Sequence, residues 1–355
     1  MNIPLFSIIS PIYNASAHLR GAFEQITRQS FTNFEWILID DGSTDDSLAL
    51  LHDLQDLDDR LVVLHESNQG SGPARNLGID HARGKWIVFY DVDDQLESNL
   101  LERVAHHVEG NDSTCVLVFG YDSYDVFYKT LTIADFPALE MQSNHEVRAG
   151  YVDHLMGLRF SNGFVWNKVF DREFLNKHRL RMPALLIQQD EVFCLEVYRH
   201  AEHIKIIPDV LYHYYVYSCG NTRSRFIPNR LDIYSCVIQS FLALYDDWQL
   251  SDERMLRYVY RRFFQNIIDS LNLNCFCDEV ERVESSITKM ITRHDVVQCV
   301  AAMQRLHIVP DGGRQKRYFE AIASQNVRAI VMLHRCDEFW GKFKRELHRL
   351  YNKLR

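Results

Sequence analysis

The chain has 355 residues, 46% hydrophobic and 25% charged, which is ordinary for a folded protein and enough for one large domain or two smaller ones. Its formal net charge of −9 argues against a general nucleic-acid-binding protein, and no apolar run reaches the length of a transmembrane helix. The N-terminus lacks the basic start and small-residue cleavage site of a signal peptide, and the eight cysteines form no zinc pattern. We therefore expect a cytoplasmic protein with reduced thiols.

Short apolar runs alternate with amphipathic stretches in the first third of the chain. The runs are rich in β-branched or aromatic residues, which is typical of strands buried on both faces of a sheet. Helices are predicted between them, and right-handed crossovers would then give a mainly parallel sheet flanked by helices. The predicted strands are residues 5–10, 36–39, 61–64, 86–90 and 115–120.

Four residues mark predicted helix boundaries in this part. Ser16 is expected to cap the first helix and Asp45 the second, because both side chains can accept a hydrogen bond from a free backbone N–H. Pro73 is expected at the first position of the third helix, and Gly84 at its end.

The predicted secondary structure changes twice in the rest of the chain. Residues 121–150 predict an irregular or hairpin insertion, followed by helices and by two short strands between residues 204 and 216. From about residue 228 no strand pattern remains, and apolar residues spaced by four predict long helices. We therefore predict an α/β domain over residues 1–222 and an all-helical C-terminal domain over residues 223–355.

The last segment, residues 336–355, predicts a basic amphipathic helix. Residues 341–355 hold six Lys or Arg and one Glu, while Phe339, Trp340 and Leu347 share one helix face. Such a helix can lie on an anionic membrane surface, and equally it can pack on its own domain or mediate a homodimer.

An acidic cluster follows the most central predicted strand. The stretch is GKWIVFYDVDDQ, and it places Asp91, Asp93 and Asp94 beyond the end of that strand, where open α/β sheets bind their ligands. Crowded carboxylates repel one another unless a cation holds them, and hard oxygen ligands suit Mg²⁺ or Mn²⁺. A solvated acidic turn is the alternative interpretation of an isolated D-x-D.

The glycine-rich turn before the third helix also invites comparison with a dinucleotide fingerprint. Gly70 and Gly72 give G-x-G, but Arg75 occupies the third glycine position. The turn also follows the third strand, and no acid stands about twenty residues later in the ribose-binding place. A nicotinamide cofactor is therefore disfavoured.

Several motifs follow one another at characteristic places in the chain. They are SIISPIYN, ILIDDGSTDDS, NQGSGPARNLGIDHARG and FYDVDD, followed by VWNKVFDREFLNKHRLRMP, QQDEVF and IPDVLYHYY. This ordered set resembles family 2 glycosyltransferases of the GT-A fold, a Rossmann-like fold with a mixed, mainly parallel sheet. The resemblance covers roughly residues 5–222 and is closest to bacterial enzymes that build capsule, exopolysaccharide or lipopolysaccharide. It implies a metal-dependent, inverting transfer from a UDP-sugar to a glycan or glycolipid hydroxyl, giving a β-linkage.

The resemblance assigns donor binding to five residues of the first half. Pro11 and Tyr13 would hold the base, which Tyr13 can stack on, while Asp41 would accept the N3–H of uracil. Arg75 would face the phosphates from the first turn of a helix, with a surface salt bridge as its alternative role. Asp91 would contact ribose or a metal-bound water. For Asp41 the alternative is that either it or its neighbour caps the turn.

The same resemblance places Mn²⁺ or Mg²⁺ on the D-x-D pair. Asp93 is the expected direct ligand, with Asp91 beside it, and the metal would neutralise charge on the departing nucleoside diphosphate. Asp94 would face the sugar.

Catalysis is assigned to an acidic residue at a later helix start. Relatives show Glu-Asp there, whereas this chain has Gln189 and Asp190, followed by Glu191. Asp190 inherits the role of the base that deprotonates the acceptor, with Glu191 as the second candidate. A helix-capping acid pair is the alternative interpretation.

Three further residues are candidate contacts to sugar, phosphate or acceptor. Lys168 can approach phosphate or extend from a packed strand, and Trp166 can line the acceptor pocket or belong to the core. His213 lies in an aromatic run where relatives place a segment over the diphosphate.

Two other functions remain open from the sequence. A sugar-phosphate nucleotidyltransferase has a similar sheet and metal requirement, but would carry a glycine-rich basic loop directly after the first strand. A non-catalytic protein that binds nucleotide sugars is compatible with Gln189 and with the large helical region.

Overall fold

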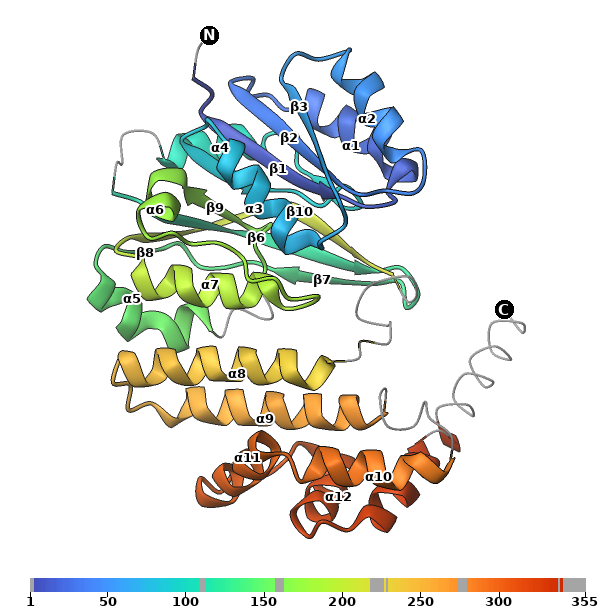
Figure 1. Cartoon of the computed structure of the whole chain (residues 1–355). Coiled ribbons are helices and arrows are strands. Elements are labelled where there is room, and N and C mark those ends of the chain that lie inside the picture. The colour runs from blue at the N-terminus through green and yellow to red at the C-terminus, as the bar shows by residue number, and fades with distance from the viewer. Residues whose placement is uncertain are drawn as a thin grey trace. The chain divides into compact units, whose positions relative to one another are not determined.

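A computed structural model of the chain describes residues 3–108, 113–156, 163–217, 227, 229–272, 280–337 and 339–340. The chain divides into two compact units, Met1–Arg225 and Phe226–Arg355. The first is an α/β unit built on one sheet, and the described part of the second is helical (Figure 1). Within these described ranges, no helix is long and apolar enough to cross a membrane.

The sheet of the first unit has the strand order β3-β2-β1-β4-β9-β6-β10-β5, with β7 paired to β6 and β8 paired to β10. The first four strands are parallel; β2, β1 and β4 are buried almost throughout, as their apolar runs predict, while β3 is mostly half-buried. The strands are β1 (Phe6–Ile12), β2 (Phe34–Asp41), β3 (Leu61–Glu66), β4 (Trp86–Phe89), β5 (Gln95–Leu96), β6 (Val116–Asp125), β7 (Thr130–Ala134), β8 (Leu139–Met141), β9 (Lys168–Asp171) and β10 (Ile204–Val216).

Strand direction decides where the loops gather. β9 is antiparallel to both β4 and β6, and β10 is parallel to β6. Consequently β1, β2, β4, β6 and β10 all end at the same edge of the sheet. The loops that follow them, including Asp91–Asp94, therefore converge there, as ligand-binding loops do in open α/β sheets.

Helices cover the parallel strands. α1 (Ser16–Thr27), α2 (Ser47–Gln55) and α3 (Ser71–His81) connect β1 to β4, and α3 crosses β1 and β2 in Figure 1. The close approach of α3 depends on Gly78, since a Cβ there would lie 2.4 Å from Cγ2 of Ile9. The remaining helices of the unit are α4 (Leu100–Val108), α5 (Asn144–Gly150), η1 (Tyr151–Leu155), α6 (Arg172–Lys177) and α7 (Gln189–His200).

Three predicted helix boundaries are wrong. Gly84 does not end α3, because the helix stops at His81 and Ala82 is its C-cap. Ser16 is the first residue of α1 rather than its cap, because its N–H donates to Asp45 of the α2 loop and so uses a cap from another element. Pro73 is the third residue of α3, since the helix starts at Ser71. Asp45 does accept from the amide of Ser47 at the start of α2.

The region over residues 121–150 is more regular than its sequence indicates. β6 continues to Asp125 and turns into β7, so that a long hairpin extends beyond the sheet. β10 is one bulged strand rather than two short ones, because it pairs with β6 on both sides of its irregularity.

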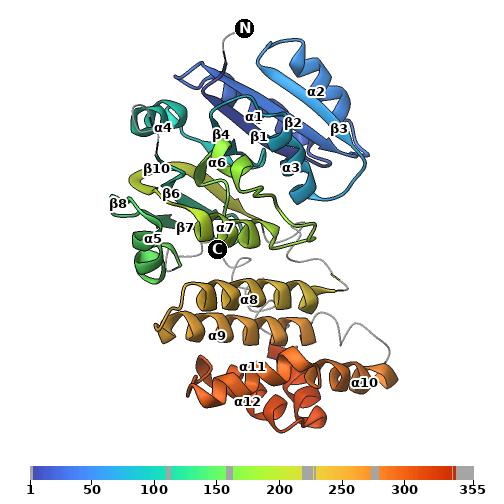
Figure 2. The same cartoon turned by 60° about the vertical axis from the view of Figure 1, so that its left-hand side comes forward.

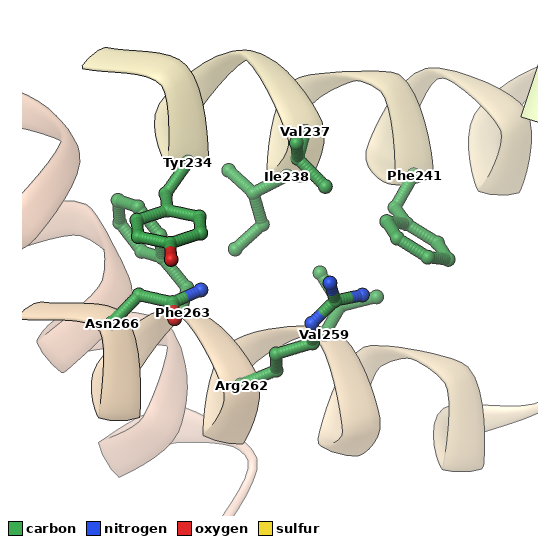
Figure 3. Close-up of a pocket in the computed structure, with 8 residues that line it drawn as sticks. All are labelled: Tyr234, Val237, Ile238, Phe241, Val259, Arg262, Phe263 and Asn266. Carbon is green, nitrogen blue, oxygen red and sulfur yellow. The ribbon is translucent and has the colours of Figure 1, made fainter. Parts of the chain in front are cut away.

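The second unit consists of antiparallel and crossing helices, which Figure 2 shows from another side. A pocket lies between α8 and α9; its walls are mostly apolar, with Arg262 and Asn266 as polar members (Figure 3). The helices are α8 (Arg230–Asp247), α9 (Glu253–Ser270), α10 (Val280–Ile291), α11 (His294–Arg305) and α12 (Gly312–Ala323).

The predicted basic helix over residues 336–355 lies largely outside the described residues. Phe339 and Trp340 are described, are well exposed, and form an edge-to-face pair with centroids 6.1 Å apart.

Gly84→Ala is expected to destabilise the first unit by about 1–3 kcal/mol. A Cβ at this position would lie 2.6 Å from the backbone carbon of Phe6, and β1 cannot retreat while it pairs with β2 and β4. The shift of the denaturant midpoint measures the effect. Gly21→Ala in α1 is the control, because a Cβ there meets nothing within 4 Å. Equal midpoints for the two variants would contradict this packing argument.

Candidate active site

The acidic loop after β4 separates its three carboxylates by environment. Asp93 is exposed, Asp91 is partly exposed and Asp94 is buried. The pKa of Asp93 is raised, first by partial desolvation in the crowded loop and then by the negative charge of Asp91. The loop therefore presents two accessible acids that repel each other and one acid that belongs to the interior.

Asp94 is bound by two residues of β10. Its Oδ2 accepts from the hydroxyl of Tyr212 at 2.7 Å, and its Oδ1 accepts from the amide of Tyr215 at 3.0 Å. Burial, followed by the charges of Asp93 and Asp91, raises its pKa well above the usual value. These contacts fasten the acidic loop to β10.

Arg75 lies at the centre of the site. Its side chain is buried, and its Nη2 donates to Oδ1 of Asp91 at 2.6 Å. Burial acts to lower its pKa, but the negative charges of Asp91 and then Asp190 raise the pKa above the ordinary value. The guanidinium thus bonds to the D-x-D loop and interacts electrostatically with Asp190 at the start of α7, a segment far away in the chain.

Asp190 is half-buried in the first turn of α7. Its Oδ1 accepts from the amide of Glu191 at 2.9 Å, and its charge acts on Lys168 as well as on Arg75. Glu191 is buried and packs closely against Gly163. A Cβ added to Gly163 would lie 2.6 Å from the Cβ of Glu191. Of the two candidate bases, Asp190 is the one with access to solvent.

Gln189 joins the two helices that begin at the site. Its Nε2 donates to Oγ of Ser71, the first residue of α3, at 2.6 Å. Gly72 leaves room for this contact, because a Cβ there would lie 3.0 Å from Cγ of Gln189. The sequence shows Gln189 only as a departure from the family motif, whereas the structure gives it a positioning contact.

The predicted base-binding residues lie at the ends of β1 and β2. Tyr13 is 46% exposed and Pro11 partly exposed. Asp41 is buried, and its carboxylate accepts from the amides of Gln69 and Gly70 at 2.7 and 2.9 Å. Asp40 binds the amide of Ser43 within the same turn, while its Oδ1 is buried without a partner. Both acids therefore hold turns at this edge.

Trp166 belongs to a buried aromatic stack under the site. Its ring stacks on Tyr212 with centroids 4.4 Å apart and on Phe164 at 4.6 Å. Lys168 is also fully buried, and its Nζ donates to backbone oxygen of Phe164 and to Oδ1 of Asn167. Burial lowers the pKa of Lys168 to about 8.

His213 lies on β10 between two carboxylates. Its Nδ1 is 2.9 Å from Oδ2 of Asp122, and its Nε2 is 3.1 Å from Oε1 of Glu97. Both ring nitrogens thus have protein partners, and the ring links β10 with β6 and with the segment after β5.

Two residues of α1 were missed by the sequence analysis. Gln25 donates to the backbone oxygen of Asp94 and accepts from the amide of Leu96, so it braces the acidic loop from behind. The charge of His18 acts against the burial and the negative charge of Asp91, which together raise the pKa of Asp93. Neither residue stands in a motif, and only the packing of α1 against the loop reveals them.

Residues 7–172 match the protein family described as Glycosyl transferase family 2. Among its relatives in Bacillus subtilis (strain 168), the glycosyltransferase EpsH is 26% identical over 291 residues, which are 72% of this chain and 81% of EpsH. The glycosyltransferase EpsJ is 30% identical over 213 residues, 60% of this chain and 61% of EpsJ. The chain therefore spans less than two thirds of EpsJ.

The fold is also seen in S. aureus TarS 1-349 in complex with UDP-GlcNAc. The TM-score is 0.66 at 17% identity, over 94% of this chain and 91% of that one. The chain has the GT-A fold and is a glycosyltransferase, and its residues 7–172 match family 2. The resemblance to family 2, the fold class and the enzyme class predicted from the ordered motifs are confirmed.

Gln189→Ala and Ser71→Ala are expected to be coupled in a double-mutant cycle. Removing either partner breaks the same hydrogen bond, so the unfolding free energies of the single and double variants should reveal a coupling of about 0.5–1.5 kcal/mol. Gln29→Ala paired with Ser71→Ala is the additive control, because Gln29 binds the backbone of Glu97 elsewhere. Strict additivity in the first pair would show that the contact does not join the helices.

Proposed function

We propose that this glycosyltransferase moves a sugar from a UDP-sugar to a hydroxyl group of a growing bacterial surface glycan, with inversion at the anomeric carbon. Two contacts carry the proposal: Arg75 of α3 bonds to Asp91 of the acidic loop, and Gln189 bonds to Ser71, which brings the start of α7 with Asp190 to the start of α3. Donor and acceptor functions predicted in distant segments thereby share one small region at the ligand-binding edge of the sheet.

The donor end of this site is formed by the turns after β1, β2 and β3. Tyr13 offers an exposed ring for stacking on a base, and the turn held by Asp41 follows the neighbouring strand β2 at the same edge of the sheet. Asp41 would reach the base only with lone pairs that its bonds to Gln69 and Gly70 leave over. A protonated N3 on uracil is the partner that a carboxylate favours over cytosine. The UDP-GlcNAc complex of TarS, which has the same fold, supports a uridine donor.

A divalent cation fits the acids that remain accessible. The described residues contain no group of three or more His, Cys, Asp or Glu side chains arranged to hold a metal. Mg²⁺ or Mn²⁺ with substrate phosphates and water needs only one or two carboxylates, which Asp93 and the free side of Asp91 provide. Desolvation and then the charge of Asp91 raise the pKa of Asp93, and a bound cation would offset both effects. When bound, it would supply charge neutralisation for the departing diphosphate.

Asp190 is the residue we assign to the acceptor. Its carboxylate would take the proton of the acceptor hydroxyl as the hydroxyl oxygen bonds to the anomeric carbon. The bond from that carbon to the diphosphate oxygen would break on the opposite side, and UDP would leave with the electron pair. Arg75 would orient Asp91 through their direct bond, and its positive charge would stabilise the ionised form of Asp190.

Asp93→Asn is expected to abolish divalent-cation-dependent release of nucleotide from UDP-sugars. The experiment incubates the purified chain with UDP-, GDP- and CMP-sugars with and without Mn²⁺ and quantifies the free nucleotide, while calorimetry measures binding. Asp53→Asn, an exposed acid of α2, is the control and should behave as the wild type. If the wild type binds no nucleotide in calorimetry, the proposed donor chemistry is wrong.

Asp190→Asn is expected to lower kcat for transfer by about 10²–10⁴-fold, the usual contribution of a general base. Donor affinity should change little, because Asp190 is assigned to the acceptor. Single-turnover rates and donor Kd values separate the two effects. Glu196→Gln on the same helix is the matched control. A large loss of donor affinity with unchanged kcat would remove Asp190 from the role of base.

A further inference from the structure

The β6–β7 hairpin carries an unusual amount of exposed apolar surface. Five large side chains within residues 126–133 are each between 39% and 68% exposed. Clustered apolar exposure of this kind marks an interaction surface, whereas single exposed apolar residues do not. We name these residues the hairpin patch: Val126, Phe127, Tyr128, Leu131 and Ile133.

The turn that presents the hairpin patch is structurally fixed. Oδ1 of Asp125 accepts from the amides of Phe127 and Tyr128 at 2.9 and 2.8 Å, and Lys129 takes a left-handed conformation with φ of 54°. The amide of Val126 donates to Val216 of β10. The backbone is therefore held while the two aromatic rings remain outside.

The patch continues along one face of the hairpin toward the sheet. Leu131 is paired with Tyr124 in the β6–β7 register, and the ring of Tyr124 packs edge-to-face on Tyr215 with centroids 6.1 Å apart. The amide of Tyr215 in turn donates to Asp94 of the acidic loop. A chain of direct contacts thus connects the patch to the active site.

The hairpin also extends in the direction of the site. β4 and β6 end at the same edge of the sheet, so the turn after β6 lies beyond the edge that carries Asp91 and Asp93. Figure 1 shows the hairpin running out alongside the end of β10. Whatever covers the patch therefore lies on the side where ligands enter.

We propose that the hairpin patch docks this enzyme on a lipid bilayer by inserting Phe127, Tyr128 and their apolar neighbours into the interfacial region. Aromatic residues with an apolar body and a polar tip suit that region. Asp125 and Lys129 are the charged residues of the segment from 125 to 133, and their charges cancel. Insertion is therefore driven by apolar burial and does not require anionic lipid.

The size of the patch favours a bilayer over a second copy of the chain. A stable protein interface buries about 800 Å² on each partner with complementary packing. The hairpin offers a five-residue strand and a turn, which is less than such an interface requires. In the described part of the chain no strand covers the outer edge of β7, but a fluid interface needs no complementary strand.

Docking would place the open edge of the sheet at the bilayer surface. On the proposed function, the acceptor hydroxyl would then belong to a membrane-anchored molecule that reaches Asp190 from the lipid side. The docking itself does not depend on that function, since it is measured by binding and not by turnover.

The test measures partition of the full chain onto large unilamellar vesicles of phosphatidylcholine and phosphatidylglycerol (7:3) by co-sedimentation. Sodium chloride at 0.15 M and 0.5 M separates apolar from electrostatic binding, because salt screens charge. The paired variant Phe127→Ser with Tyr128→Ser removes the tip. Leu57→Ser removes an equally exposed apolar side chain outside the hairpin and is the control.

We expect wild-type partition to persist at 0.5 M salt, to fall at least about tenfold in the paired variant and to stay unchanged in Leu57→Ser. Absence of wild-type binding, loss of binding at high salt, or equal binding of the paired variant would each overturn the proposal. A dimer in sedimentation equilibrium that the paired variant abolishes, without vesicle binding, would assign the patch to a second copy and also overturn it. Circular dichroism verifies that the variants are folded.

Discussion

The buried guanidinium of Arg75 is the charge that the acids of the site compensate. Arg75 cannot shed its charge, and removing it from water is costly unless carboxylates and hydrogen bonds replace the lost hydration. Asp91 provides the direct bond, and Asp190 contributes its charge from another segment. The burial of one cation therefore depends on acids from the loop after β4 and from α7.

The region around this cation is kept in place by polar contacts on one side and aromatic packing on the other. Gln189 and Ser71 tie the starts of α7 and α3 together, and Tyr212 fastens Asp94 while its ring stacks on Trp166. The acids that would contact substrate are thus held in place by residues that would not contact substrate themselves. Asp94 illustrates the division, because its carboxylate is occupied by β10 and its neighbour Asp93 is exposed.

The same strand order links the site to the surface beyond it. Because β4, β6 and β10 end at one edge, the acidic loop, the hairpin and the end of β10 share that edge. Tyr215 makes the connection directly, with its amide on Asp94 and its ring against Tyr124. The hairpin beside the site is therefore connected to the acidic loop by direct contacts.

The sequence by itself determined the α/β class, the alternation of strands and helices along the first half of the chain, and the resemblance to family 2 glycosyltransferases. Apolar runs and acids at strand ends are patterns of neighbouring residues, so they can be recognised without knowing which segments meet in the folded chain. It could not show that Asp41 is occupied by the Gln69 turn, that Asp94 is buried on Tyr212, or that β10 is a single strand. Gln25 and His18 belong to no motif. Ser16 is not the helix cap, because its own N–H donates to Asp45. These features depend on contacts between segments far apart in the chain, and only the tertiary structure decides which polar groups meet and which stay free for substrate.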